Sequence, residues 1–294
     1  MHTDILASTH ILSEGQASRS ALMVARLRAA HQLLDSPPLF DDPLALPLLG
    51  EEHGADLRAN PRAFDAGFNR LLRAAMAVRS RFAEDELAQA VAQGVRQYVV
   101  LGAGLDTFAC RRRHEAEGLR VFEVDHPATQ AWKRALLAAS GIDVPHGLCF
   151  VPVDFERDTL ADALRDAGCQ LEQPVFFSWL GVTLYLSGPA IMQTLRFVAG
   201  LPQGSGIAFD YGIKPELLGA MERSGIEYFA KRYAEQGEPW LSFFDPDELQ
   251  VTLRELGFAQ VANFSPAQLE NRYFSGLAGS LRLSGGTHLM LARN

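Results

Sequence analysis

The sequence lacks several features that mark whole classes of protein. None of its apolar runs approaches the roughly 18 residues of a membrane-spanning helix, so we expect no membrane contact. Its net charge of -8 lacks the surplus of Lys and Arg that neutralises nucleic-acid phosphates, which argues against a nucleic-acid partner. Its three cysteines, Cys110, Cys149 and Cys169, lack the spacing of a metal site. We therefore expect a soluble cytoplasmic protein without a metal.

What is present is enough for a large core. The chain has 294 residues, of which 48% are hydrophobic and 21% charged. Apolar residues recur at helical spacing over residues 18–34, 61–81 and 84–94, before any strand pattern appears. We therefore predict a helical extension over residues 1–94 and a core domain over residues 95–294.

In the core, short apolar runs alternate with helical patterns, which predicts an α/β fold with parallel strand pairing. The runs expected to be strands are 97–101, 120–124, 149–153, 175–179, 206–211, 259–264 and 287–292. The helices expected between them are 130–139, 158–167, 190–201 and 245–256. The pattern predicts one mostly parallel sheet of about seven strands with helices on both faces.

One connection is unusually long. Residues 212–244 separate the fifth expected strand from the next helix and carry aromatic side chains of their own. A long insertion at the carboxyl end of a strand is a common place for a substrate cover, although these rings could also pack on the sheet edge. We interpret residues 212–244 as a lid.

The ends of consecutive strands carry a pattern suited to a nucleoside. Gly102, Ala103 and Gly104 follow the first strand, and Asp125 closes the second, about 20 residues later, where an acid reaches a bound ribose. The third strand is followed by Asp154 and Phe155, which suit an exocyclic amine and a purine face. Asp154 is also a plausible helix cap. Because ligands bind at the carboxyl ends of parallel strands, we expect these residues to share one site.

The glycine loop departs from two familiar phosphate-binding patterns. A dinucleotide loop has a third glycine, and here that position is Thr107. The G-K-[ST] of an ATP-binding loop is missing as well. A nicotinamide-dependent dehydrogenase is therefore a weaker alternative.

The motifs resemble those of the leucine carboxyl methyltransferase family, and its bacterial O-methyltransferases of natural-product pathways in particular. The segments that carry the resemblance are 40–43, 78–82, 101–107, 122–127, 153–155 and 179–185. The resemblance implies a Rossmann-like class I methyltransferase fold and S-adenosyl-L-methionine as the cofactor.

The resemblance also implies roles for individual residues. Arg79 would bind the methionyl carboxylate, the loop from Gly102 to Asp106 the methionyl portion, Asp125 the ribose, and Asp154 with Phe155 the adenine. Many relatives carry an acid where this chain has Leu180, which leaves the cofactor amino group without that partner. Tyr185 and Tyr211 are either substrate contacts or core aromatics.

Methyl transfer from a sulfonium needs alignment and exclusion of water more than proton transfer. The sequence ties no base to the site, which mildly favours a carboxylate acceptor, since a carboxylate is already ionised. We hypothesise O-methylation of a carboxylate or hydroxyl of a small metabolite or peptide terminus. A non-catalytic cofactor-binding protein is the alternative from another class.

Overall fold

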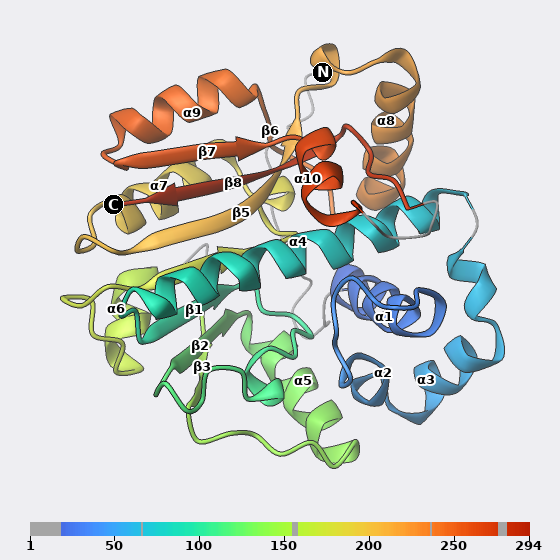
Figure 1. The fold of residues 1–294 in the computed structure, drawn as a ribbon, viewed down its shortest axis with the longest axis horizontal. Coiled ribbons are helices and arrows are strands. Elements are labelled where there is room, and N and C mark those ends of the chain that lie inside the picture. Colours follow the sequence, from blue (N-terminus) through green and yellow to red (C-terminus); the bar gives the residue numbers. More distant parts are fainter. Residues whose placement is uncertain (1–18, 66, 155–157, 236, 276–280) are drawn as a thin grey trace, which may run out of the picture.

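The computed structural model describes residues 19–65, 67–154, 158–235, 237–275 and 281–294 of the chain (Figure 1). The fold is α/β, with helices on both faces of one sheet. Its strands are β1 (Gln97–Leu101), β2 (Arg120–Asp125), β3 (Leu148–Pro152), β4 (Phe176–Trp179), β5 (Gly206–Ile213), β6 (Phe243–Phe244), β7 (Gln260–Phe264) and β8 (Thr287–Arg293).

The strand order confirms the predicted mostly parallel sheet. The order is β3-β2-β1-β4-β5-β8-β7, with β6 paired to the end of β5. The strand β8 runs antiparallel to both β5 and β7, and the other pairs are parallel. All seven predicted strands are present. The eighth, β6, has two residues and is too short to produce a periodic pattern.

The side chains of the central strands alternate between two cores. Val99 and Leu101 of β1 pack with α6 (Leu160–Asp166), α7 (Gly188–Ala199) and α9 (Pro246–Glu255). Tyr98 and Val100 point to the opposite face and pack with α4 (Gly67–Ala92) and α10 (Pro266–Tyr273). The strands are apolar on both sides because both faces are covered.

The amino-terminal helices differ from the prediction in one respect. Residues 61–81 and 84–94 were expected to form two helices, but they form a short 3-10 turn, Pro61–Phe64, followed by the single helix α4. No helix breaker separates Arg81 from Glu84, so the helix continues. Its apolar stripe changes neighbours along its length: Met76 packs with α1 (Arg19–Leu34), while Leu87 packs under the sheet.

Several helices were not expected from the sequence. These are α2 (Ala45–Leu48), α3 (Gly50–Ala59), α10 and α8 (Ala220–Glu235), the last of which lies within the predicted lid. No residue of helix α8 is fully buried, although its apolar residues Ile226, Phe229 and Tyr233 recur on one face. Helix α5 (Pro127–Ala139) begins three residues before the predicted start, because His126 caps it through Nδ1. No helix among the described residues is long and apolar enough to cross a membrane.

Candidate functional site

A cavity of about 810 Å³ opens at the carboxyl ends of β1, β2, β4 and β5. One end is lined by the glycine loop after β1 and by the acids that follow the neighbouring strands. The other end lies among α1, α4 and α8, which meet beside the sheet edge (Figure 1). The structure thus brings most of the predicted site residues to one place: Arg79, Gly102, Ala103, Gly104, Asp106, Asp125, Asp154, Leu180 and Tyr185.

The glycine loop needs glycine for two separate reasons. Gly102 and Gly104 have φ angles of 64° and 49°, in the left-handed region that other residues rarely adopt. A Cβ on Gly102 would lie 2.3 Å from Cγ2 of Val182, so the Val182 side chain, in the loop after β4, packs directly against this glycine. The loop therefore presents main chain, rather than side chains, to the cavity.

Asp125 at the end of β2 holds this loop. Its Oδ2 accepts a hydrogen bond from Gly104 N at 2.6 Å, and its Oδ1 accepts one from His126 N at 2.7 Å. Burial raises the pKa of the Asp125 carboxyl, although these backbone donors act to lower it. The carboxyl group faces the cavity, where it has acceptor capacity left for a ligand hydroxyl.

An acid that the sequence analysis missed lies opposite the glycine loop. Asp210 of β5 accepts a hydrogen bond from Arg79 Nη1 at 2.9 Å and another from Gly181 N at 2.6 Å. Both charged side chains are largely buried and line the cavity, with 12% and 7% of the Arg79 and Asp210 side chains exposed. An acid closing an apolar strand, as at Asp125, was the signal that could have revealed Asp210.

Asp210 supplies a carboxylate near Leu180, the position at which many relatives carry an acid. Leu180 follows β4, whose last residue, Trp179, pairs with Phe209 of β5. Asp210 therefore lies on the adjacent strand beside Leu180. The cavity has a carboxylate at this end, supplied by β5 instead of by the β4 loop.

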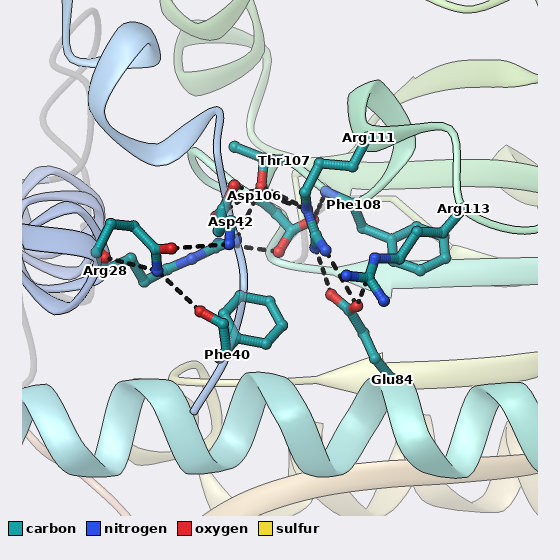
Figure 2. Close-up of polar contacts among 10 residues, drawn as sticks. Arg28, Phe40, Asp42, Glu84, Asp106, Thr107, Phe108, Arg111 and Arg113 are labelled. Carbon is teal, nitrogen blue, oxygen red and sulfur yellow. Dashed lines mark hydrogen bonds and ion pairs between the residues drawn. The ribbon is translucent and has the colours of Figure 1, made fainter. Parts of the chain in front are cut away.

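Beneath the glycine loop, a buried ion network joins it to the helices (Figure 2). Arg28 of α1 donates to Asp42 at 2.5 Å, to Asp106 at 3.0 Å and to the Thr107 hydroxyl at 2.9 Å. The Thr107 hydroxyl in turn donates to Asp42 at 2.8 Å and accepts from Arg111 Nε at 3.1 Å. Thr107, the position of the absent third glycine, is thus the centre of a polar cluster.

The same network reaches helix α4. The guanidinium of Arg111 pairs with the Glu84 carboxylate, and Glu84 Oε2 also lies 3.7 Å from Arg113 Nε (Figure 2). Burial acts to raise the pKa of Asp106, but the charges of Arg28, Lys133 and Arg111 and the backbone hydrogen bond from Phe108 together lower it overall. Asp106 is therefore ionised and fixed in place at the floor of the cavity.

Three of the predicted site residues differ in where the structure places them. Phe155 lies outside the described residues. Tyr211 lies outside the cavity lining; its side chain is buried, and its hydroxyl donates to Asn263 Oδ1 at 2.8 Å. Asp154 lines the cavity, and its backbone N–H is bound by Asp158 at 2.8 Å.

The far end of the cavity is apolar and aromatic. Phe68 of α4 stacks on Phe229 of α8 with ring centroids 3.8 Å apart. Other side chains lining this end are Met23, Val24, Leu27, Leu72, Met76, Ile226, Tyr233, Trp240 and Phe243. Helix α8 of the predicted lid thus forms a wall of the cavity.

Comparison with known sequences decides the family. The sequence profile of the leucine carboxyl methyltransferase family matches residues 21–199. The chain belongs to the leucine carboxyl methyltransferase family. It is 30% identical over 291 residues to YktD of Bacillus subtilis (strain 168), named as a candidate S-adenosyl-L-methionine-dependent methyltransferase, covering 92% of this chain and 95% of that protein. A relative from Mycobacterium marinum, named in the same way, is 33% identical over 228 residues, covering 74% of this chain and 69% of that protein.

Solved structures agree with the fold of this methyltransferase. A DUF574 family protein from Streptomyces avermitilis has a TM-score of 0.57 at 18% identity, covering 96% of this chain and 99% of that one. A candidate methyltransferase from Thermobifida fusca has a TM-score of 0.55 at 16% identity, covering 99% of both chains. These likenesses confirm the predicted fold class.

The residues of the cavity fit the S-adenosyl-L-methionine of the family. The adjacent charges of Arg79 and Asp210 match the opposite charges of an amino-acid group, and the glycine loop lines the same cavity. The cofactor supplies an activated methyl group on a positively charged sulfur. The family membership favours this methyltransferase over the dehydrogenase alternative.

Proposed function

We propose that this methyltransferase transfers the methyl group to an oxygen atom of a small, largely apolar acceptor. The acceptor oxygen belongs to a carboxylate or a hydroxyl, on a metabolite such as a natural-product intermediate or at a peptide terminus. The observation that carries the proposal is one continuous cavity that is polar at the glycine loop and apolar between α4 and α8.

We assign the polar end to the cofactor. Arg79 would bind its carboxylate as a guanidinium fork, and Asp210 would accept from its ammonium group. Asp125 would accept from the ribose hydroxyls, with Asp154 on the adenine side. These assignments place the sulfur between the glycine loop and the apolar end, where an acceptor would lie.

The apolar end supports a small acceptor with a ring or branched chain. Stacked and tilted aromatic rings bind flat apolar groups and exclude water, which is the main requirement of methyl transfer. Helix α8 forms one wall of the cavity in this region.

Calorimetry with S-adenosylmethionine, S-adenosylhomocysteine and NAD tests the cofactor assignment. We expect the first two to bind and NAD not to bind. Release of S-adenosylhomocysteine should then be measured with matched phenols, alcohols and carboxylic acids of similar apolar shape. Binding of the cofactor without turnover of any acceptor would favour a non-catalytic role.

A further inference from the structure

Among the cavity-lining carboxylates that have no part in the cofactor assignment, Glu238 is buried and belongs to the segment after β5. Glu238 follows α8 in the lid, is 5% exposed and lines the cavity. Its Oε1 accepts a hydrogen bond from Ser20 N at 3.4 Å, at the start of α1. A carboxylate that lines the cavity is able to accept a proton from a bound hydroxyl group.

Two sets of contacts place Glu238 near the glycine loop and the loop after β4. Ala21, next to Ser20, lies against the glycine loop. A Cβ added to Gly104 would be 3.3 Å from the Cβ of Ala21. The chain just beyond Glu238 is tied to the loop after β4, with Leu241 N donating to Leu184 O at 2.6 Å. Glu238 is thus held between the glycine loop and the β4 loop.

The neighbouring side chains are aromatic. The Tyr233 ring stacks on Trp240 at 5.4 Å and meets Tyr185 at 6.5 Å. Burial, and then the charge of Glu238, raise the pKa of Tyr233, although the Arg79 charge acts to lower it. The pKa of Tyr185 is raised by burial first, with the charges of Tyr233 and Glu238 adding to it. Both phenols therefore stay protonated at neutral pH, and neither is a base.

The charges around the cavity also limit the acceptor. Of the cavity-lining residues that the structure describes, the arginines are Arg28 and Arg79, and both are held in ion pairs with aspartates. A carboxylate acceptor beside Glu238 would bring a second negative charge into a buried site. A hydroxyl would instead donate a hydrogen bond to that carboxylate.

We propose that Glu238 is the general base of the reaction and that the acceptor group is a hydroxyl, a phenol in view of the aromatic walls. The inference rests on the proposed methyltransferase function. The acceptor oxygen bonds to the transferred methyl carbon, and the carbon–sulfur bond breaks with its electron pair left on sulfur. The hydroxyl proton passes to a carboxylate oxygen of Glu238, so the positive charge of the sulfonium and the negative charge of Glu238 are both lost.

The absence of a base in the sequence was the reason to favour a carboxylate acceptor. Glu238 removes that reason, because the fold brings it to the cavity from a part of the chain far from the strand motifs. Glu238→Gln is a suitable test substitution, since the amide oxygen keeps an acceptor for Ser20 N while it loses the charge.

The test uses 4-nitrophenol, a phenol whose absorbance reports its own ionisation, bound to the complex with S-adenosylhomocysteine. In the wild-type complex, the Glu238 charge should raise the pKa of the bound phenol by about one pH unit relative to Glu238→Gln. Glu238→Asp should keep a raised value. Glu227→Gln, at an exposed position on α8, should match the wild type.

Equal pKa values of the bound phenol in the wild type and Glu238→Gln would overturn the proposal, as would a complex that does not bind 4-nitrophenol. Calorimetry with S-adenosylhomocysteine is carried out first on each variant. If the wild type does not bind S-adenosylhomocysteine, the proposed function itself is refuted. If it binds, but the pKa of the bound phenol is the same in the wild type and Glu238→Gln, only the role of Glu238 is refuted.

Discussion

Arg79 Nη1 donates to Asp210 Oδ2 across 2.9 Å and thereby joins helix α4 to strand β5. Neither partner is near the other in the sequence, so the pair exists only because α4 crosses the sheet. In the described part of the cavity this pair offers two opposite charges side by side.

Asp210→Asn should weaken binding of S-adenosylhomocysteine by about 1–3 kcal/mol, because a charged hydrogen-bond acceptor is lost and Arg79 loses its anchor. Isothermal calorimetry measures the change. The double variant with Arg79→Gln should lose less than the sum of the single losses, since the two side chains act as a unit. Asp162→Asn, which breaks the exposed pair with Arg165, should leave affinity unchanged. Affinity unaltered in Asp210→Asn would remove this residue from the site.

Gly181→Ala should displace Arg79 and weaken cofactor binding by about 1 kcal/mol or more. A Cβ at Gly181 would lie 2.7 Å from Arg79 Nη2, and the residue has a φ angle of 73°. Gly118→Ala is the matched control, since its φ angle is 72° and a Cβ there meets nothing within 4 Å. Both variants should lose about 1 kcal/mol of stability from backbone strain, measured by urea unfolding. Equal cofactor affinities in the two variants would contradict the contact argument.

Asp125→Ala should weaken S-adenosylhomocysteine binding by about 1–3 kcal/mol, the range for a lost charged acceptor. The variant also removes the acceptor of Gly104 N, so the glycine loop loses an anchor. Calorimetry should be repeated with Asp143→Ala, an exposed aspartate, which we expect to bind like the wild type. If Asp125→Ala binds equally well, the ribose assignment is wrong.

Stability should fall as the pH rises from about 5 to about 8, in part because of the buried pair Glu123 and Lys133, whose side chains are each 1% exposed. Burial raises the pKa of Glu123 to about 7, although the Lys133 charge acts to lower it. The folded protein therefore keeps a proton that the unfolded chain has lost in this window, and the stabilisation disappears as the pH passes the folded pKa.

The double variant Glu123→Gln, Lys133→Met removes both charges from this pair. Urea unfolding of the wild type should show an extra loss of about 1–3 kcal/mol between the two pH values, relative to the double variant. Parallel pH curves for the two proteins would mean that Glu123 does not titrate in this window.

The centre of the sheet was predictable because β1, β4 and β5 are buried throughout, and the continuous apolar runs of such strands are visible in sequence. Asp245 also gave a clear signal, since its side chain caps α9 by accepting from Asp247 N and Glu248 N. Ser265 forms a capping box with Gln268 at the start of α10, although no helix was predicted there.

The acceptor end of the cavity was not predictable to the same degree. Glu238 lies in the lid, and its position depends on how α8 and β6 fold back onto β5. That return is set by contacts such as Ser242 Oγ to Leu186 O at 2.5 Å, between segments with no shared pattern. Acids at the ends of parallel strands are predictable, because those ends meet at one edge of the sheet. No such rule gives the position of a residue in an insertion.

Thr107 has a consequence for how this loop can change in evolution. A single replacement by glycine would produce the spacing of a dinucleotide loop, yet it would also remove a buried hydroxyl that binds Arg28, Arg111 and Asp42. Three partners would lose a hydrogen bond at once, and leaving buried charged partners unsatisfied costs about 1–3 kcal/mol or more. We therefore expect that Thr107→Gly alone would destabilise the protein. A change of this loop toward a dinucleotide-binding sequence would first require substitutions in the ion network beneath it.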